Sequence, residues 1–173
     1  MLHLYILYLW MNQLQKDMKT LTIETLIQVY AYHELSAEER ELTKSALEAT
    51  HRSYAPYSNF HVGAAVLLEN GTIVTGTNQE NMAYPSGLCA ERTALFYANS
   101  QYPEVAVKAL AIVARDVDGV TNRYVISPCG ACRQVMVETE KRFGKPIRVL
   151  LCGAEEVYVC ESAASLLPLS FEF

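Results

Sequence analysis

Two short cysteine clusters constrain this chain more than any other feature. The first is Cys89-Ala-Glu91 and the second is Pro128-Cys-Gly-Ala-Cys132. Three thiolates can bind zinc and leave its fourth position to a water, whose pKa then falls to about 7, whereas four protein ligands are typical of a structural zinc. Glu91 lies two residues past the first thiol, where it could carry that water's protons. Any fold of this chain therefore has to bring the two clusters together.

Both clusters are predicted to lie at helix starts. Residues 89–99 favour a helix, and Ser127 and Pro128 are typical of the N-cap and first position of a second helix that ends at Gly144. Cys129 and Cys132 would then lie one turn apart on one face. Unpaired backbone N–H groups at helix N-termini favour thiolates. Arg92 is placed to hydrogen bond to the sulfurs and so offset their negative charge.

The remaining patterns predict one layered α/β domain. A chain of 173 residues with 51% hydrophobic residues can fill a core without disulfides. Apolar runs and a Glu69-Asn-Gly71 hairpin signal predict strands, and a capping box at Ser36 predicts a helix. The expected strands are 20–33, 62–68, 72–76, 109–114 and 147–152, and the other expected helices are 37–52 and 162–167. Their order implies a mixed sheet of roughly five strands.

The first ten residues form an apolar run that we interpret as lying outside the domain. No basic residue precedes the run, no small-x-small cleavage site follows it, and it is too short to span a bilayer. Met11 and Met18 follow closely, so we expect residues 1–17 to be an upstream extension and residues 18–173 to form the single domain. The alternatives are an amphipathic segment packed on the domain and a membrane anchor.

Charge and cysteine content exclude some partners. The formal net charge is −5, and the 14 basic residues are scattered, so we expect no nucleic-acid partner and no membrane partner. Five cysteines are an odd number, and a Cys-x-x-Cys pair in a chain of this size favours metal binding over a disulfide framework. A reducing, cytoplasmic setting fits this composition best.

From Tyr54 to Phe171 the chain resembles the zinc-dependent cytidine deaminases, in particular their small, three-cysteine, homotetrameric type. Both cysteine clusters carry the resemblance. It implies a three-layer α-β-α fold and one Zn²⁺ per subunit, bound by Cys89, Cys129 and Cys132. It also implies hydrolysis of cytidine and 2'-deoxycytidine to uridine, 2'-deoxyuridine and ammonia by a zinc-activated water in pyrimidine salvage, with Glu91 as the proton carrier.

The resemblance also implies substrate contacts. Asn78 and Glu80 match residues that hydrogen bond the ribose hydroxyls, and Phe60 and the Ala90 backbone match contacts to the base. Tyr84 and Phe171 match aromatic residues that a neighbouring subunit of the homotetramer contributes. Two departures from the family pattern are a longer segment before Tyr54 and the position of Phe171, two residues from the end.

The sequence leaves other functions open. A deaminase of a cytosine-bearing antibiotic such as blasticidin S would share the metal site and differ at the sugar, although Asn78 and Glu80 favour ribose. The acidic balance argues against a polynucleotide deaminase. A non-catalytic zinc module would need Cys152 or Cys160 as a fourth ligand, and Glu91 would then be a solvated charge at a helix start.

Overall fold

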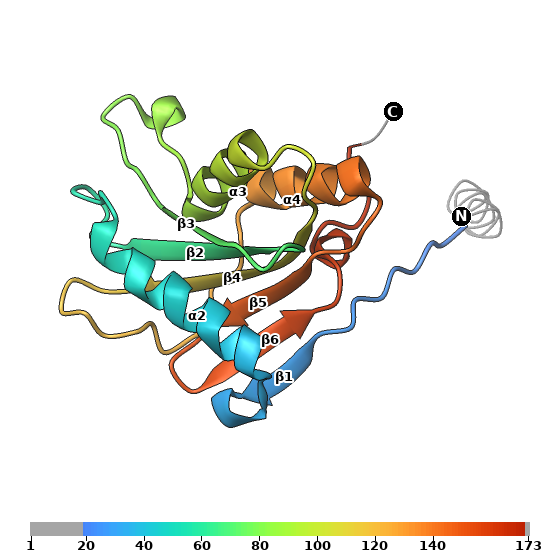
Figure 1. The fold of residues 1–173 in the computed structure, drawn as a ribbon, viewed down its shortest axis with the longest axis horizontal. Helices are drawn as coiled ribbons and strands as arrows, with labels where there is room; N and C mark the ends of the chain where they lie inside the picture. Colours follow the sequence, from blue (N-terminus) through green and yellow to red (C-terminus); the bar gives the residue numbers. More distant parts are fainter. Residues whose placement is uncertain (1–18, 172–173) are drawn as a thin grey trace, which may run out of the picture.

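Six strands form one mixed sheet in the computed structural model, which describes residues 19–171 (Figure 1). The strand order is β1-β6-β5-β4-β2-β3. β4 and β5 are parallel, and the other four neighbouring pairs are antiparallel. The strands are β1 Gln28–Ala31, β2 His61–Leu68, β3 Ile73–Thr77, β4 Val107–Arg115, β5 Arg148–Cys152 and β6 Glu156–Cys160.

The mixed sheet is confirmed, and its predicted strand number is corrected from five to six. The strand that the sequence analysis missed is β6, in which Val157 and Val159 are buried. The expected first strand, 20–33, is shorter than predicted, because only Gln28–Ala31 pairs, and its partner is β6. Residues 19–26 are exposed and outside any strand. Without a neighbouring strand to pair with, their β-prone composition does not produce a strand.

Helices cover both faces of the sheet, which confirms the three-layer architecture. In Figure 1, α2 (Ala37–Ala49) crosses one face, and α3 (Ala90–Gln101) and α4 (Gly130–Phe143) lie on the other. Two clusters of buried residues correspond to these faces. One joins Leu42 and Ala46 of α2 to the sheet, and the other joins Leu95 of α3 and Met136 of α4 to it. Four 3₁₀ segments complete the described elements: η1 Tyr32–Glu34, η2 Thr50–Arg52, η3 Tyr84–Ser86 and η4 Ala163–Leu166.

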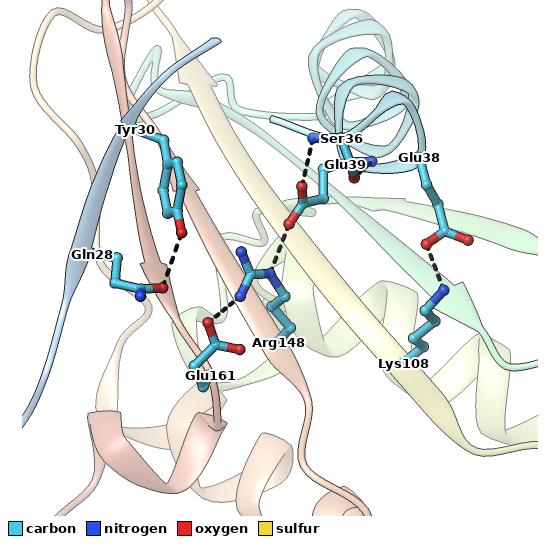
Figure 2. Close-up of polar contacts among 8 residues, drawn as sticks. All are labelled: Gln28, Tyr30, Ser36, Glu38, Glu39, Lys108, Arg148 and Glu161. Carbon is cyan, nitrogen blue, oxygen red and sulfur yellow. Dashed lines mark hydrogen bonds and ion pairs between the residues drawn. The ribbon is translucent and has the colours of Figure 1, made fainter. Parts of the chain in front are cut away.

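The start of α2 is tied to the sheet by ion pairs (Figure 2). Ser36 and Glu39 form the predicted capping box. The other oxygen of Glu39 accepts from Arg148 Nε of β5 at 2.7 Å, and Arg148 also pairs with Glu161, which follows β6. Lys108 of β4 pairs with Glu38 at 2.5 Å. These contacts fix α2 across the strands on the face opposite α3 and α4.

A glycine allows α3 to approach β3 closely. A Cβ atom at Gly76 would lie 2.3 Å from the backbone nitrogen of Ala94 and 2.6 Å from the carbonyl oxygen of Ala90. Any larger residue at Gly76 would therefore push α3 away from the sheet. Since Cys89 is the N-cap of α3, this contact sets the depth at which the first cysteine cluster lies.

The expected extension, residues 1–17, lies outside the described residues. Within residues 19–171, no helix has the length and apolar character needed to cross a bilayer.

Candidate zinc centre and cleft

Three cysteine sulfurs meet where the starts of α3 and α4 converge. Cys89 is the N-cap of α3, Cys129 is the N-cap of α4, and Cys132 lies in the first turn of α4. The Sγ atoms of Cys89 and Cys129 are 3.7 Å apart, and those of Cys129 and Cys132 are 3.4 Å apart. Tetrahedral zinc with bonds of about 2.3 Å needs sulfurs about 3.8 Å apart. The spacing and the soft thiolate donors therefore fit Zn²⁺.

The start of α4 differs from the prediction. Ser127 and Pro128 were expected to open the helix, but the helix begins at Gly130 after Cys129, whose backbone is extended. The Ser127 hydroxyl accepts a hydrogen bond from Arg133 instead of capping the helix. The shift puts Cys129 at the N-cap, equivalent to Cys89 on α3, so both clusters present a thiol at a helix N-terminus.

Arg92 and the thiols shape the charge of the cluster. The Arg92 Nη2 atom donates to Cys89 Sγ at 3.9 Å. The hydrogen bond with Cys132, followed by those with Arg92 and Cys129, outweighs burial and lowers the pKa of Cys89. The same contact with Cys89, together with burial, raises the pKa of Cys132. The two shifts are opposite in direction because the two thiols share one contact.

Glu91 is a buried carboxyl group beside the sulfurs. Its exposed fraction is 4%, and its side chain lines the adjoining cleft. Burial is the main cause that raises the pKa of Glu91, and the nearby Cys89 thiolate raises it further, whereas a hydrogen bond from Cys132 and the charge of Arg92 oppose the shift. A carboxyl group with a raised pKa is suited to taking up and releasing a proton near neutral pH.

A cleft of about 970 Å³ opens in front of the cluster. It is large enough for a small-molecule ligand. Nine of the candidate site residues line it: Phe60, Asn78, Glu80, Tyr84, Cys89, Ala90, Glu91, Arg92 and Cys129. Cys132 is fully buried behind the cleft. The structure thus brings the expected metal, proton-carrying and substrate residues to one place, with the exception of Phe171.

The Asn78 and Glu80 side chains are already engaged with the protein. Asn78 Oδ1 accepts from Ser53 Oγ and from the Val62 backbone nitrogen, and Asn78 Nδ2 donates to the Phe60 carbonyl at 2.8 Å. These bonds use both lone pairs of the amide oxygen and one N–H, which leaves one N–H for a ligand.

Glu80 fixes the loop at Tyr57 and Ser58, which also lines the cleft. Its Oε2 accepts from the backbone nitrogens of Tyr57 and Ser58, and its Oε1 accepts from the Ser58 hydroxyl. The Ser58 hydroxyl contact is the main cause that lowers the pKa of Glu80. An ionised carboxylate has about four acceptor positions, so one remains for a ligand hydroxyl.

The three candidate aromatic residues occupy different places. Phe60 lines the cleft and is 38% exposed, and Tyr84 lines its rim and is 79% exposed. Phe171 is 72% exposed and is not among the residues that line the cleft of its own chain. Its backbone is instead held by the Gln134 side chain of α4.

Several residues that support the site were missed from the sequence. Arg133 binds the loop before Cys129, Ser58 binds Glu80, and Glu140 accepts hydrogen bonds from the backbone nitrogens of Ile147 and Ala163. The only sequence signal for Arg133 is its position directly after Cys132. Glu140 gave none, because a charged residue on a helix is usually solvated.

The positions of the cysteines distinguish a three-ligand zinc site from a closed structural site with four ligands. Within residues 19–171, the group that could hold a metal consists of Cys89, Cys129 and Cys132. Cys152 and Cys160 are not part of it and are fully buried in the core, so the structure brings no fourth thiol to the cluster within the described chain. This arrangement corresponds to a three-ligand site and not to a closed structural one.

Comparisons with known proteins agree with this geometry. Residues 36–144 match the family model described as the cytidine and deoxycytidylate deaminase zinc-binding region. Cytidine deaminase of Halalkalibacterium halodurans is 46% identical over 56% of this chain and 68% of its own length. That of Sporosarcina psychrophila is 50% identical over 57% of this chain and 67% of its own. The crystal structure of cytidine deaminase from Burkholderia pseudomallei is 42% identical, with a TM-score of 0.62 over 76% of this chain and 97% of that one. The chain therefore belongs to the cytidine and deoxycytidylate deaminase family of zinc-binding proteins.

Proposed function

We propose that this protein hydrolyses the 4-amino group of cytidine and 2'-deoxycytidine, and acts in pyrimidine salvage. The products are uridine or 2'-deoxyuridine and ammonia, so one water is consumed for each amine released. The observation that carries the proposal is the buried Glu91 carboxyl beside three cysteine sulfurs at the cleft. Membership of the family and the names of the relatives support cytidine as the substrate.

Cys89, Cys129 and Cys132 hold the metal in this proposal, one Zn²⁺ per subunit. When bound, zinc supplies a Lewis acid that makes a coordinated water more acidic. Three thiolates would weaken this effect by their negative charge. The hydrogen bond from Arg92 to Cys89 and the two helix N-termini draw charge from the sulfurs and so offset it.

Glu91 moves the protons. Its carboxylate takes one proton from the attacking water and delivers it to ring nitrogen 3 of the base, and then takes the second proton from the same oxygen, now bonded to carbon 4, and delivers it to the departing amine. Burial excludes water that would otherwise compete for these protons, and the raised pKa lets the carboxyl group hold a proton between the steps. In this proposal the Ala90 backbone, directly before Glu91, contacts the edge of the base.

Asn78 and Glu80 provide one donor and one acceptor for the sugar. Asn78 retains one amide N–H, and Glu80 retains one acceptor position, after the bonds described above. A ribose hydroxyl can accept from the first and donate to the second. Phe60, which also lines the cleft, packs against the nucleoside in this proposal.

Nucleosides are expected to be much better substrates than nucleoside 5'-monophosphates. Among the residues lining the cleft in the described chain, Arg92 is the single cation, and it is engaged with Cys89. A phosphate would lack a charge-assisted partner, which costs about 1.5–3 kcal/mol for each missing bond. We therefore expect kcat/KM for cytidine to exceed that for CMP by at least about 100-fold.

Loss of absorbance on deamination measures the turnover of each substrate directly. Cytidine, 2'-deoxycytidine, CMP and blasticidin S are compared before and after zinc chelation. Zinc-dependent turnover of the two nucleosides supports the proposal. Turnover of blasticidin S alone, or faster turnover of CMP than of cytidine, would contradict it.

We further propose a homotetramer in which neighbouring subunits complete the active sites. Tyr84 at the cleft rim and Phe96 and Tyr97 of α3 are large exposed aromatic side chains, between 47% and 79% exposed. Exposed aromatic surface favours association. Phe171 is exposed and outside the cleft of its own chain, so it could reach a site only in another subunit.

A hybrid experiment is expected to reveal shared sites. Subunits carrying Glu91→Gln lack the proton carrier, and subunits carrying Phe171→Ala lack the aromatic ring, so each homotetramer should turn over poorly. Co-expressed hybrids should contain sites with an intact Glu91 from one subunit and an intact Phe171 from another, and should exceed the sum of the two parents. Hybrids no more active than that sum, or an active monomer by light scattering, would contradict shared sites.

We also propose a cytoplasmic location and a single domain. All five cysteines are free thiols, which suits a reducing, cytoplasmic setting. The pairing of β1 with β6 supports a domain that begins before the matched family region, and we propose that residues 18–173 form this single domain.

A further inference from the structure

The loop that precedes Cys129 is held by a side chain from the helix that follows it. Arg133 Nε donates to the Pro128 carbonyl oxygen at 2.8 Å, and Arg133 Nη2 donates to Ser127 Oγ at 2.7 Å. Residues 125–129 belong to no helix or strand, and proline has no backbone N–H with which to anchor the loop. The position of the Cys129 sulfur therefore depends on this contact.

The same guanidinium reaches the C-terminal segment. Arg133 Nη1 donates to the Leu166 carbonyl oxygen at 2.8 Å, at the end of η4. The next residue, Gln134, exchanges two hydrogen bonds with the backbone of Phe171, and Glu140 accepts from the Ala163 backbone nitrogen at 2.7 Å. Helix α4 thus holds the segment 163–171 along its length, and Arg133 joins that segment to the loop before the metal ligand.

The geometry of the guanidinium group, more than its charge, explains why an arginine occupies position 133. A guanidinium is planar and offers five N–H donors in a fixed fork, which suits three acceptors in different directions. A lysine ammonium group is a compact point charge on a flexible stem and cannot hold the same three acceptors in place. Arg92, not Arg133, is the arginine that contacts a cluster sulfur.

We infer that Arg133 is a positioning residue for the zinc site. Through Pro128 and Ser127 it fixes the Cys129 thiolate, and through Leu166 it links that thiolate to the segment that carries Phe171. The inference rests on the zinc site of the proposed function. It does not depend on the deamination reaction, because its test measures the affinity of the protein for zinc.

The test is the substitution Arg133→Lys, which keeps the charge and removes the fork. We expect its zinc affinity, measured by competition with a chromogenic chelator, to fall about 10- to 100-fold, as for other residues that orient metal ligands. The matched control is Arg142→Lys on the same helix, because Arg142 Nη2 also donates to a proline carbonyl, that of Pro103, at 2.7 Å. The control disturbs one hydrogen bond where Arg133→Lys disturbs three, so it should lose no more thermal stability than Arg133→Lys and should keep wild-type zinc affinity.

Ser127→Ala keeps Arg133 and removes one acceptor, so it carries the test even if Arg133→Lys does not fold. We expect a smaller loss of zinc affinity, about 3- to 10-fold, and little further loss when it is combined with Arg133→Lys, because both act through one contact. Wild-type zinc affinity in Ser127→Ala and Arg133→Lys, or an equal loss in Arg142→Lys, would overturn the inference. If the affinities follow the expected order but cytidine is not deaminated, the proposed function fails and the positioning role stands.

Discussion

Replacing Glu91 by Gln is expected to lower kcat by about 100- to 10,000-fold while the fold and the zinc content are retained. Glutamine has nearly the same shape as glutamate and cannot take up or release a proton at neutral pH. The water would then lose its base, and both ring nitrogen 3 and the leaving amine would lose their acid. The cost should appear in kcat more than in KM, because the missing contacts are made as the reaction proceeds.

The same substitution is expected to leave thermal stability unchanged or raised. Burial of the Glu91 carboxyl disfavours its ionised form, and this cost is removed in the amide. Calorimetry and zinc analysis check this, with Glu138→Gln, an exposed position on α4, as the matched control. Turnover within about tenfold of wild type, in protein with full zinc, would show that Glu91 is not the proton carrier.

Removing the Cys129 sulfur is expected to abolish both zinc binding and turnover. Cys129 is the suitable ligand to replace, because it is exposed, whereas Cys132 is fully buried and its replacement would also disturb packing. Cys129→Ala leaves two thiols, and we expect zinc affinity to fall by more than about 100-fold, beyond the effect of losing an orienting residue. Turnover should fall to the uncatalysed level at ordinary zinc concentrations.

Cys160→Ala is the control for this prediction, because it removes a buried core thiol outside the cluster. It should keep one zinc per subunit and most of its activity. Chelation should inactivate the wild type reversibly and lower its thermal midpoint, since a metal present at about 1,000 times its dissociation constant stabilises the folded state by about 4 kcal/mol. Full zinc content in Cys129→Ala, or loss of zinc in Cys160→Ala, would refute the assignment of ligands.

Local sequence patterns predicted most of the elements that carry the site. The capping box at Ser36 and the glycine at Gly144 correctly marked the start of α2 and the end of α4. The cysteine spacing predicted that two helix starts meet, and the sulfur distances bear this out. These features are encoded within a few residues, where capping and helical periodicity act.

Contacts between distant parts of the chain were the main omissions. Strand β6 has only five residues and follows β5 after a short turn. Its hydrophobic pattern is too short to indicate a separate strand. The start of α4 was predicted two residues too early because of Ser127, whose hydroxyl accepts a hydrogen bond from Arg133 instead of capping the helix. The hydrogen bonds of Asn78 and Glu80 to neighbouring loops also depend on tertiary structure, which spacing along the sequence does not reveal.

The short strand β1 affects how readily the edge of the sheet can pair with another chain. Without it, β6 would be an outer strand whose unpaired N–H and C=O groups could recruit a strand from another chain. β1 pairs with four residues of β6 and becomes the outer strand itself. A strand of four residues offers fewer sites for edge-to-edge pairing, so β1 protects this side of the sheet against aggregation.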